Sequence, residues 1–366
     1  TIALHYVFNS PEDKLIWDVG HQIYAHKILT GRKEEFKSIR KFKGISGFPK
    51  QIESEHDIYN TGHSSTSLSL ALGEAISRDL TNKDNKVIAI IGDGSLTGGM
   101  ALEALNHIGH LPHDLIIILN DNEHSISKNV GAISEYLTRI ISGHLYNTIR
   151  KKSMKFTRKI PKIGEPLYSF INRFFDSFKG ILTPGQFFQD MGIRYFGPID
   201  GHNIHNLVEL LNNVKDINMG PKLIHVITKK GKGYLPAELN PSKFHGIGPF
   251  DKSTGVVPSK SGISYSEIAG KTLAYISKYD KRIIAITAAM KLGTGLSEFE
   301  KASSDRFFDV GIAEQHAITL AGAMSRNGLK PFVSIYSTFL QRAIDQIIHD
   351  IAIMNLPIKL LIDRSG

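Results

Sequence analysis

The stretch Lys86–His124 constrains the fold more than any other part of the sequence. An apolar run at Val87–Ile91 predicts a fully buried strand, and it stops at the turn Gly92–Ser95, where glycine permits tight backbone and close approach of a ligand. A helix is expected next, and a second buried strand, Leu115–Leu119, ends at Asn120-Asp121-Asn122. This order of elements is a β-α-β unit, which favours an α/β fold with a parallel sheet.

Oxygen-rich side chains follow both strands of this unit. Ligands bind beyond the carboxyl ends of parallel strands, so Asp93 and Asn122 are expected side by side. One carboxylate and one amide oxygen are too few for a cage made of protein alone, and they suit Mg²⁺, which completes its octahedron with phosphate and water. The alternative is a plain turn in which Asp93 caps the next helix, because short motifs have many false matches.

The length of 366 residues predicts two domains, because single hydrophobic cores stop growing near ~250–300 residues. Strands and helices alternate again after a segment rich in Gly, Pro, Ser and Lys. We therefore expect a first domain at 1–250, a linker at 251–262 and a second domain at 263–366, which includes one long helix at Phe339–Asn355. The predicted fold class is α/β, with two doubly wound, mostly parallel-sheet domains.

Composition excludes several classes of protein. The sequence has no cysteine, which excludes disulfides and thiolate-bound metals, and no run of ~18 apolar residues that would span a membrane. The formal charge is +9, but the clearest basic cluster lies in an expected flexible arm at about 150–165, without a helix or strand organised to read nucleic acid. We expect a cytoplasmic protein that binds neither nucleic acid nor membrane.

Polar loops follow other predicted strands. The loop Thr61–Ser67 contains Gly62, His63 and Ser64 and precedes a helix, whose N-terminus its hydroxyl groups would cap and where an anion would be favoured. His63 is expected to face a phosphate group. His21 follows a short strand. It could lie in the loop at the end of that strand, or it could be a buried core histidine.

The segment after the strand Lys222–Thr228 holds Lys230 and Tyr234. Either Lys230 or Lys232 could reach a phosphate or carboxylate, and a solvated turn is the equal alternative.

Two arrangements in the second domain indicate chemistry. Glu314 lies in the first turn of a helix, where a carboxylate complements the helix dipole, and capping alone is the alternative. Tyr336, Arg342 and Arg364 lie at neighbouring strand ends and suit a phosphate monoester, which arginine binds with two hydrogen bonds. Surface salt bridges are the alternative for each arginine taken singly.

Several blocks, taken together, resemble the 1-deoxy-D-xylulose 5-phosphate synthases, a transketolase-like family. The blocks cover the chain nearly end to end: Asp18–Gln22, Gly62–Ser67, Gly92–Ser95 with Asn120–Asn122, Gly197–His202, Lys230–Tyr234, Asp309–Ala317 and Tyr336–Asp345. The resemblance implies the thiamine diphosphate-binding fold, with thiamine diphosphate and Mg²⁺ as cofactors and a homodimer as the assembly.

The resemblance also implies roles for individual residues. Mg²⁺ would be bound by Asp93, Asn122 and the carbonyl group of His124. Thiamine diphosphate would be bound by His21, Gly62, His63, Ser64, Gly94, Ser95, Asn122, Lys230, Tyr234, Glu314 and Phe339. Glu314, His21 and His63 would be the catalytic residues, and Glu314 would hydrogen-bond the aminopyrimidine ring. Tyr336, Arg342 and Arg364 would hold the phosphate group of D-glyceraldehyde 3-phosphate.

The implied reaction condenses pyruvate with D-glyceraldehyde 3-phosphate and releases CO₂ and 1-deoxy-D-xylulose 5-phosphate. The chain begins within an apolar pattern and ends just after a buried strand, so we expect a fragment of a longer protein. Transketolase and the 2-oxo acid dehydrogenase components remain alternatives among thiamine diphosphate enzymes. A basic nucleic-acid-binding or scaffold protein on the same fold is the non-enzymatic alternative.

Overall fold

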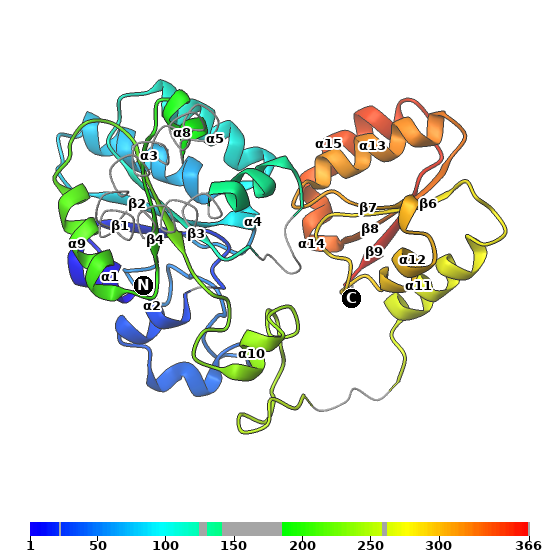
Figure 1. The fold of residues 1–366 in the computed structure, drawn as a ribbon, viewed down its shortest axis with the longest axis horizontal. Helices are drawn as coiled ribbons and strands as arrows, with labels where there is room; N and C mark the ends of the chain where they lie inside the picture. Colours follow the sequence, from blue (N-terminus) through cyan, green and yellow to red (C-terminus); the bar gives the residue numbers. More distant parts are fainter. Residues whose placement is uncertain (22, 124–129, 141–184, 258–261, 365–366) are drawn as a thin grey trace, which may run out of the picture. The chain divides into compact units, whose positions relative to one another are not determined.

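The computed structural model describes residues 1–21, 23–123, 130–140, 185–257 and 262–364. The chain forms two compact units (Figure 1): unit 1 consists of Thr1–Leu96, Met100–Asn122 and Ala132–Thr228, and unit 2 of Thr97–Gly99, Glu123–Gly131 and Lys229–Gly366. The basic arm expected at about 150–165 lies outside the described residues. The domain boundary expected at 251–262 stays a prediction.

Unit 1 contains a five-stranded sheet in the order β1-β2-β3-β5-β4, and every neighbouring pair is parallel. Its strands are β1 (Lys14–Trp17), β2 (Val87–Gly92), β3 (Ile116–Asp121), β4 (Arg194–Asp200) and β5 (Lys222–Ile227). Its helices are α1 (Ile2–Val7), α2 (Tyr24–Leu29), η1 (Glu34–Ser38), α3 (Ser67–Leu80), α4 (Asp93–Leu96), α5 (Gly99–His110), α8 (Gln186–Asp190) and α9 (Ile204–Lys215).

Alternating strand residues of this sheet enter two separate hydrophobic cores. Ala89 and Ile91 of β2 pack with side chains of α3 and α5 on one face. Ile88 and Ile90 of the same strand pack with α1 and α9 on the other. Because side chains alternate along a strand, two cores on opposite faces require apolar residues at every position, which explains the unbroken apolar runs of β2 and β3.

Unit 2 contains a four-stranded parallel sheet in the order β7-β6-β8-β9. Its strands are β6 (Ile283–Thr287), β7 (Phe307–Asp309), β8 (Lys330–Tyr336) and β9 (Lys359–Asp363). Its helices are α10 (Leu235–Leu239), α11 (Tyr265–Ile276), α12 (Ser297–Ala302), η2 (Ser304–Arg306), α13 (Glu314–Arg326), α14 (Ser337–Leu340), η3 (Gln341–Ala343), α15 (Ile344–Gln346) and η4 (Ile347–Ala352). One core lies against α13 and the other against α11 and α12, so this sheet is also covered on both faces.

The predicted α/β fold class with two parallel sheets is confirmed, whereas the long helix expected at Phe339–Asn355 is wrong. The structure divides that stretch into α14, a 3₁₀ turn, α15 and a π-helical segment at Ile347–Ala352. Ala343, Ile347 and Ile351 face the core at intervals of four residues, a spacing that a single α-helix also shows, so the sequence pattern gives no sign of this division.

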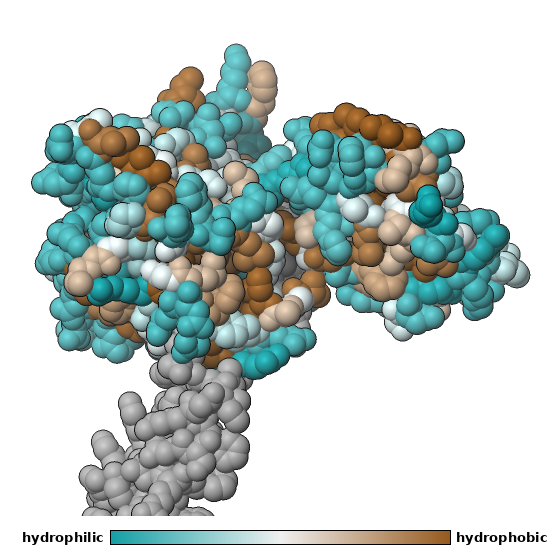
Figure 2. Space-filling view, turned by 90° about the horizontal axis from the view of Figure 1, so that it is seen from above, coloured by the Kyte–Doolittle hydropathy of each residue, from teal (hydrophilic) through white to brown (hydrophobic). Residues whose placement is uncertain are grey.

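Figure 2 shows hydrophilic side chains over much of one face, with hydrophobic ones in separate patches between them. Among the described residues, no helix combines the length and apolar character needed to cross a membrane.

Candidate functional site

The carboxyl ends of β2 and β3 bring two buried carboxyl groups together in unit 1. The register pairs Gly92 with Asn120, so the residues that follow, Asp93 and Asp121, are neighbours. Their exposed fractions are 3% and 1%. Burial, together with the charge of Asp121, raises the pKa of Asp93, while the backbone amides of Gly94 and Asn122 donate to Asp93 and oppose this rise. The structure thus confirms that Asp93 and Asn122 lie side by side.

Two residues that were not predicted, His225 and Tyr195, form a chain of hydrogen bonds to Asp121. His225 Nε2 lies 2.9 Å from Asp121 Oδ2, and the Tyr195 hydroxyl lies 2.8 Å from His225 Nδ1. The carboxylate accepts from Nε2–H, so the hydroxyl of Tyr195 donates to the other ring nitrogen. Asp121 had a signal in the sequence, the polar strand end, but His225 is fully buried in the middle of β5 and has none.

This arrangement fits a divalent cation. Two carboxylates this close repel one another, and a bound cation removes the repulsion. The described part of the chain contains no group of three or more His, Cys, Asp and Glu side chains that could hold a metal alone. Such a cation therefore needs amide, carbonyl, water or phosphate oxygens as well, which is the preference of Mg²⁺. The third predicted ligand, His124, lies outside the described residues.

The predicted anion-binding residues of unit 1 lie on two loops and a short helix. Gly62, His63 and Ser64 are half-buried before α3, and Gly94 and Ser95 are buried within α4. His21 is exposed on the loop after β1, which answers the question left open for it: it is not a core histidine.

The predicted capping of α3 by its own loop is wrong. The residue before the helix, Thr66, makes no side-chain cap bond. The amide of Ser67 donates instead to the carboxylate of Asp18, which lies far away in the sequence.

Lys230 and Tyr234 belong to unit 2. The Lys230 Nζ atom lies 2.8 Å from His245 Nδ1, and the Tyr234 hydroxyl donates to the carbonyl oxygen of Lys252 at 2.9 Å. The Tyr234 ring also contacts the rings of Phe244 and Phe250. Both predicted residues are thus tied into the segment that follows β5, and their contacts with a cofactor stay a prediction.

Glu314 is the first residue of α13 and is only 3% exposed. Burial raises the pKa of Glu314, and its own backbone amide and the positive charge of Arg342 oppose this rise. Its Oε2 atom is buried, and no donor among the described residues reaches it. A buried oxygen without a partner costs free energy. The carboxyl group accepts from its own backbone amide at the start of α13, but this bond leaves Oε2 without a donor, so capping explains only part of it. The atom could accept a hydrogen bond from a bound ligand.

Three predicted residues cluster next to the end of β8. The rings of Tyr336 and Phe339 stack with centroids 5.9 Å apart. The Arg364 guanidinium lies 3.9 Å from the centroid of the Tyr336 ring, and the carbonyl oxygen of Arg364 accepts from the Ser337 hydroxyl at 2.8 Å. Together with Arg342, these residues place aromatic and cationic groups in the same unit as Glu314.

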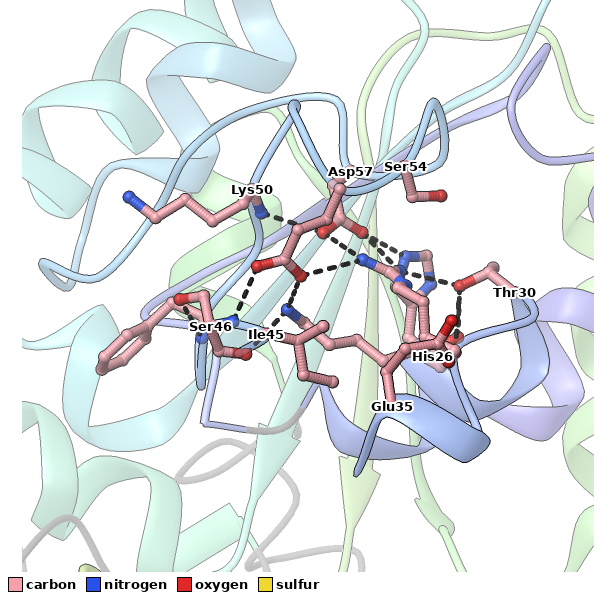
Figure 3. A network of polar contacts seen from close by, with 12 residues as sticks. His26, Thr30, Glu35, Ile45, Ser46, Lys50, Ser54 and Asp57 are labelled. Atoms are coloured by element: carbon pink, nitrogen blue, oxygen red, sulfur yellow. Dashed lines mark hydrogen bonds and ion pairs between the residues drawn. The ribbon is translucent and has the colours of Figure 1, made fainter. Parts of the chain in front are cut away.

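A buried charge network, formed by His26, Lys27, Arg32, Glu53 and Asp57, fixes the segment that precedes the Thr61–Ser67 loop (Figure 3). Arg32 binds Asp57 with two hydrogen bonds of 2.7 and 2.8 Å, and His26 Nε2 lies 3.1 Å from the same carboxylate. Lys27 lies 2.5 Å from Glu53. The positive charges of Lys27 and Arg32 are matched by the negative charges of Glu53 and Asp57, which lowers the cost of burying them.

His5 extends the network, with its Nε2 atom 2.8 Å from His26 Nδ1. Burial, with the neighbouring His26, His56 and amino terminus, lowers the pKa of His5 from 6.5 to about 4. Between these values the unfolded chain binds a proton that the folded chain does not. We therefore expect the free energy of unfolding to fall as the pH decreases from 6.5 towards 4.

The variant His5→Gln tests this expectation by urea denaturation at pH 7.5 and pH 5. The slope of the free energy of unfolding against pH should be smaller in the variant than in the wild type. Parallel profiles would show that His5 does not contribute to the acid sensitivity.

Comparisons with known proteins show which family the sequence matches. A family model described as 1-deoxy-D-xylulose-5-phosphate synthase matches residues 1–228, and the transketolase pyrimidine binding domain matches residues 261–366. Proteins named 1-deoxy-D-xylulose-5-phosphate synthase from Desulfotalea psychrophila and Halothermothrix orenii are each 56% identical to this chain over its whole length. A transketolase structure from Campylobacter jejuni is 16% identical and aligns over 98% of this chain and 63% of that one, with a TM-score of 0.43.

The chain spans 57% of the length of the Desulfotalea protein and 58% of the Halothermothrix one. The first family model alone covers more than half of the sequence. The family-model match and the whole-length identity to these relatives lead to one conclusion: the chain belongs to the 1-deoxy-D-xylulose-5-phosphate synthase family.

Proposed function

We propose that this chain forms the cofactor-binding part of a thiamine diphosphate-dependent transferase that condenses pyruvate with D-glyceraldehyde 3-phosphate, giving 1-deoxy-D-xylulose 5-phosphate and CO₂. The matched families imply thiamine diphosphate as the cofactor. The observation that carries the proposal is the buried, unpartnered Oε2 atom of Glu314, which fits a nitrogen of the aminopyrimidine ring. The product supplies isoprenoid and thiamine precursors.

Glu314 provides the central protein contribution to this chemistry. Its carboxyl group exchanges a hydrogen bond with the pyrimidine ring, and this bond is stronger in a buried site than in water. Burial raises the pKa of Glu314, and a raised pKa favours sharing of a proton with a ring nitrogen. Phe339 packs against the same ring. When bound, thiamine diphosphate supplies the electron sink that decarboxylation of pyruvate requires.

Unit 1 supplies most of the residues that we propose for the diphosphate end. Mg²⁺ would be held by Asp93 and Asn122, with the carbonyl oxygen of His124 as the third ligand that the family resemblance implies, and the buried pair Asp93 and Asp121 supports a cation there. The groups that contact the diphosphate and the neighbouring ring are His21, Gly62, His63, Ser64, Gly94, Ser95, Lys230 and Tyr234. His21 and His63 move protons to and from the reacting atoms, since histidine titrates near neutral pH.

The substrate phosphate is bound by Tyr336, Arg342 and Arg364. The stacking of Arg364 on the Tyr336 ring leaves the guanidinium edge available for a phosphate group, which it recognises with two parallel hydrogen bonds. The proposal further includes a homodimer and a cytoplasmic location.

The first test is calorimetry of thiamine diphosphate binding to this chain, with and without Mg²⁺. We expect binding that requires the metal and that is lost in the variant Asp93→Ala, because removing the carboxylate removes the only charged ligand of the set. The variant Asp84→Ala, at an exposed position before β2, is the control and should bind as the wild type does.

Release of CO₂ from pyruvate, with and without D-glyceraldehyde 3-phosphate, is then measured on the full-length protein that contains this sequence. Failure of that protein to bind thiamine diphosphate in the presence of Mg²⁺ would exclude the proposed function.

A further inference from the structure

Asp18 lies directly after β1 and is 1% exposed. Its Oδ1 atom accepts the backbone N–H of Ser65 at 2.8 Å, and its Oδ2 atom accepts that of Ser67 at 3.1 Å. Burial raises the pKa of Asp18, and these bonds oppose the rise. A buried carboxylate is retained only where strong donors compensate for the lost water. Asp18 therefore joins the end of β1 firmly to the start of α3.

The backbone around this carboxylate is strained on both sides. Val19 and Ser65 have φ angles of +58° and +71°, a region that residues other than glycine seldom occupy and that is least favourable for a β-branched side chain. Such conformations persist only where the surroundings enforce them. Val19 leads to His21, and Ser65 follows His63 and Ser64, so the two strained residues flank the predicted diphosphate-binding groups.

A third segment, the short helix α4 after β2, is linked to the same point. The Ser65 hydroxyl donates to the carbonyl oxygen of Ser95 in this helix at 2.8 Å. The backbone at Gly20 is also closely packed, since a Cβ atom there would lie 2.4 Å from Pro49 and 3.2 Å from the Thr61 hydroxyl oxygen. The loop after β1, the loop before α3 and the helix α4 are thus linked through Asp18 and Ser65.

We propose that Asp18 is a positioning residue, which holds these three segments in the one arrangement that binds the diphosphate group. The inference rests on the proposed function and adds a residue to it. Asp18 makes no direct contact with the cofactor in the proposed arrangement. It acts through the Ser65 and Ser67 amides, whose bonds fix where the loop before α3 can lie.

The same strand offers a matched control at its other end. Asp13 precedes β1 and is also buried, and its carboxylate accepts the backbone N–H groups of Asn9 at 2.8 Å and Lys86 at 2.7 Å. The chemistry equals that of Asp18, but it lies at the amino end of the parallel strands, away from the predicted site. Loss of Asp13 should therefore affect stability without affecting the binding site.

The experiment compares Asp18→Asn and Asp13→Asn in this chain. Each variant keeps the size of the side chain but replaces one acceptor oxygen by an NH₂ group, which cannot accept from an amide. We expect the affinity for thiamine diphosphate, measured by calorimetry with Mg²⁺, to fall about 10- to 100-fold in Asp18→Asn, as when outer-sphere partners of ligands are lost. Asp13→Asn should keep the wild-type affinity.

Two further readouts separate positioning from general loss of structure. Hydrogen exchange of the Ser65 and Ser67 amides should become faster in Asp18→Asn and stay slow in Asp13→Asn. In the full-length protein, Asp18→Asn should raise the KM for thiamine diphosphate, and a saturating concentration should restore most of kcat. A purely structural role would lower the amount of active protein and leave the KM unchanged.

Each result decides the question. Wild-type affinity in Asp18→Asn, or an equal loss in Asp13→Asn, would overturn the inference and leave the proposed function standing. If the full-length wild-type protein itself does not bind thiamine diphosphate, the proposed function fails, which is a different outcome. If Asp18→Asn does not fold, Ser65→Ala replaces it. This variant keeps the backbone amide that Asp18 binds and removes the hydroxyl bonds to Ser95 at 2.8 Å and Ser64 at 3.5 Å. Weaker cofactor binding supports the inference, and unchanged binding overturns it.

Discussion

Replacement of Glu314 by glutamine should lower kcat at least ~100-fold while thiamine diphosphate still binds. Glutamine keeps the shape of the side chain and can occupy the same buried position at the start of α13. An amide, however, cannot exchange a proton with a ring nitrogen, and such proton transfers contribute roughly 10²- to 10⁴-fold to catalysis. The effect should therefore appear in turnover much more than in affinity.

The measurement is the rate of CO₂ release from pyruvate by the full-length protein, with D-glyceraldehyde 3-phosphate present. The control is Glu267→Gln, which changes the same residue type in the first turn of another helix of the same unit, α11, where the carboxylate pairs with Lys271 at an exposed position. Its kcat should equal that of the wild type. If Glu314→Gln kept more than about a tenth of the wild-type kcat, the role of Glu314 in proton transfer would be wrong.

The sequence predicts the local elements around the site well, because strong local signals determine them. The apolar runs of β2 and β3 can only be buried strands, and the polar residues after them must then lie at one edge of the sheet. The register of Gly92 with Asn120 confirms this placement for Asp93 and Asn122.

The supporting residues of the site could not be predicted, because their partners are distant in the sequence. Asp18 and Ser65 are joined only once β1 and α3 have come together. His225 reads as one more residue of a buried strand, and its bond to Asp121 depends on the order in which the strands pair. Local patterns also could not show that the stretch after Phe339 is broken, since its spacing of apolar residues resembles that of a single helix.

The buried charge network could not be predicted either, because none of its residues belongs to a local sequence pattern that marks it. The bond between Arg32 and Asp57 is bidentate, and the side chain of Asp57 is fully buried. Asp57 also accepts from His26 and from the backbone amide of Lys50 at 2.9 Å. The Asp57 carboxylate thus accepts hydrogen bonds from four donor groups. No other acidic side chain in the described structure accepts directly from both His26 and Arg32.

The variant Asp57→Asn should destabilise the chain by about 3–5 kcal/mol, because it leaves the buried Arg32 only its longer ion pair of 3.6 Å to Glu53, which already pairs with Lys27. Urea denaturation at 25 °C and neutral pH measures this loss. As a control, Glu34→Gln breaks an ion pair with Lys37 that is 78% and 86% exposed, and it should change the free energy of unfolding by less than about 1 kcal/mol.

A double variant tests whether the cost comes from the uncompensated charge. In Arg32→Met with Asp57→Leu both charges are absent, so part of the lost stability should return, since apolar groups can replace a buried ion pair with little penalty. The recovery cannot be complete, because His26 and the Lys50 amide still lose their acceptor. If the double variant were no more stable than Asp57→Asn, the destabilisation would come from those neutral donors, and the ion pair itself would contribute little to the fold.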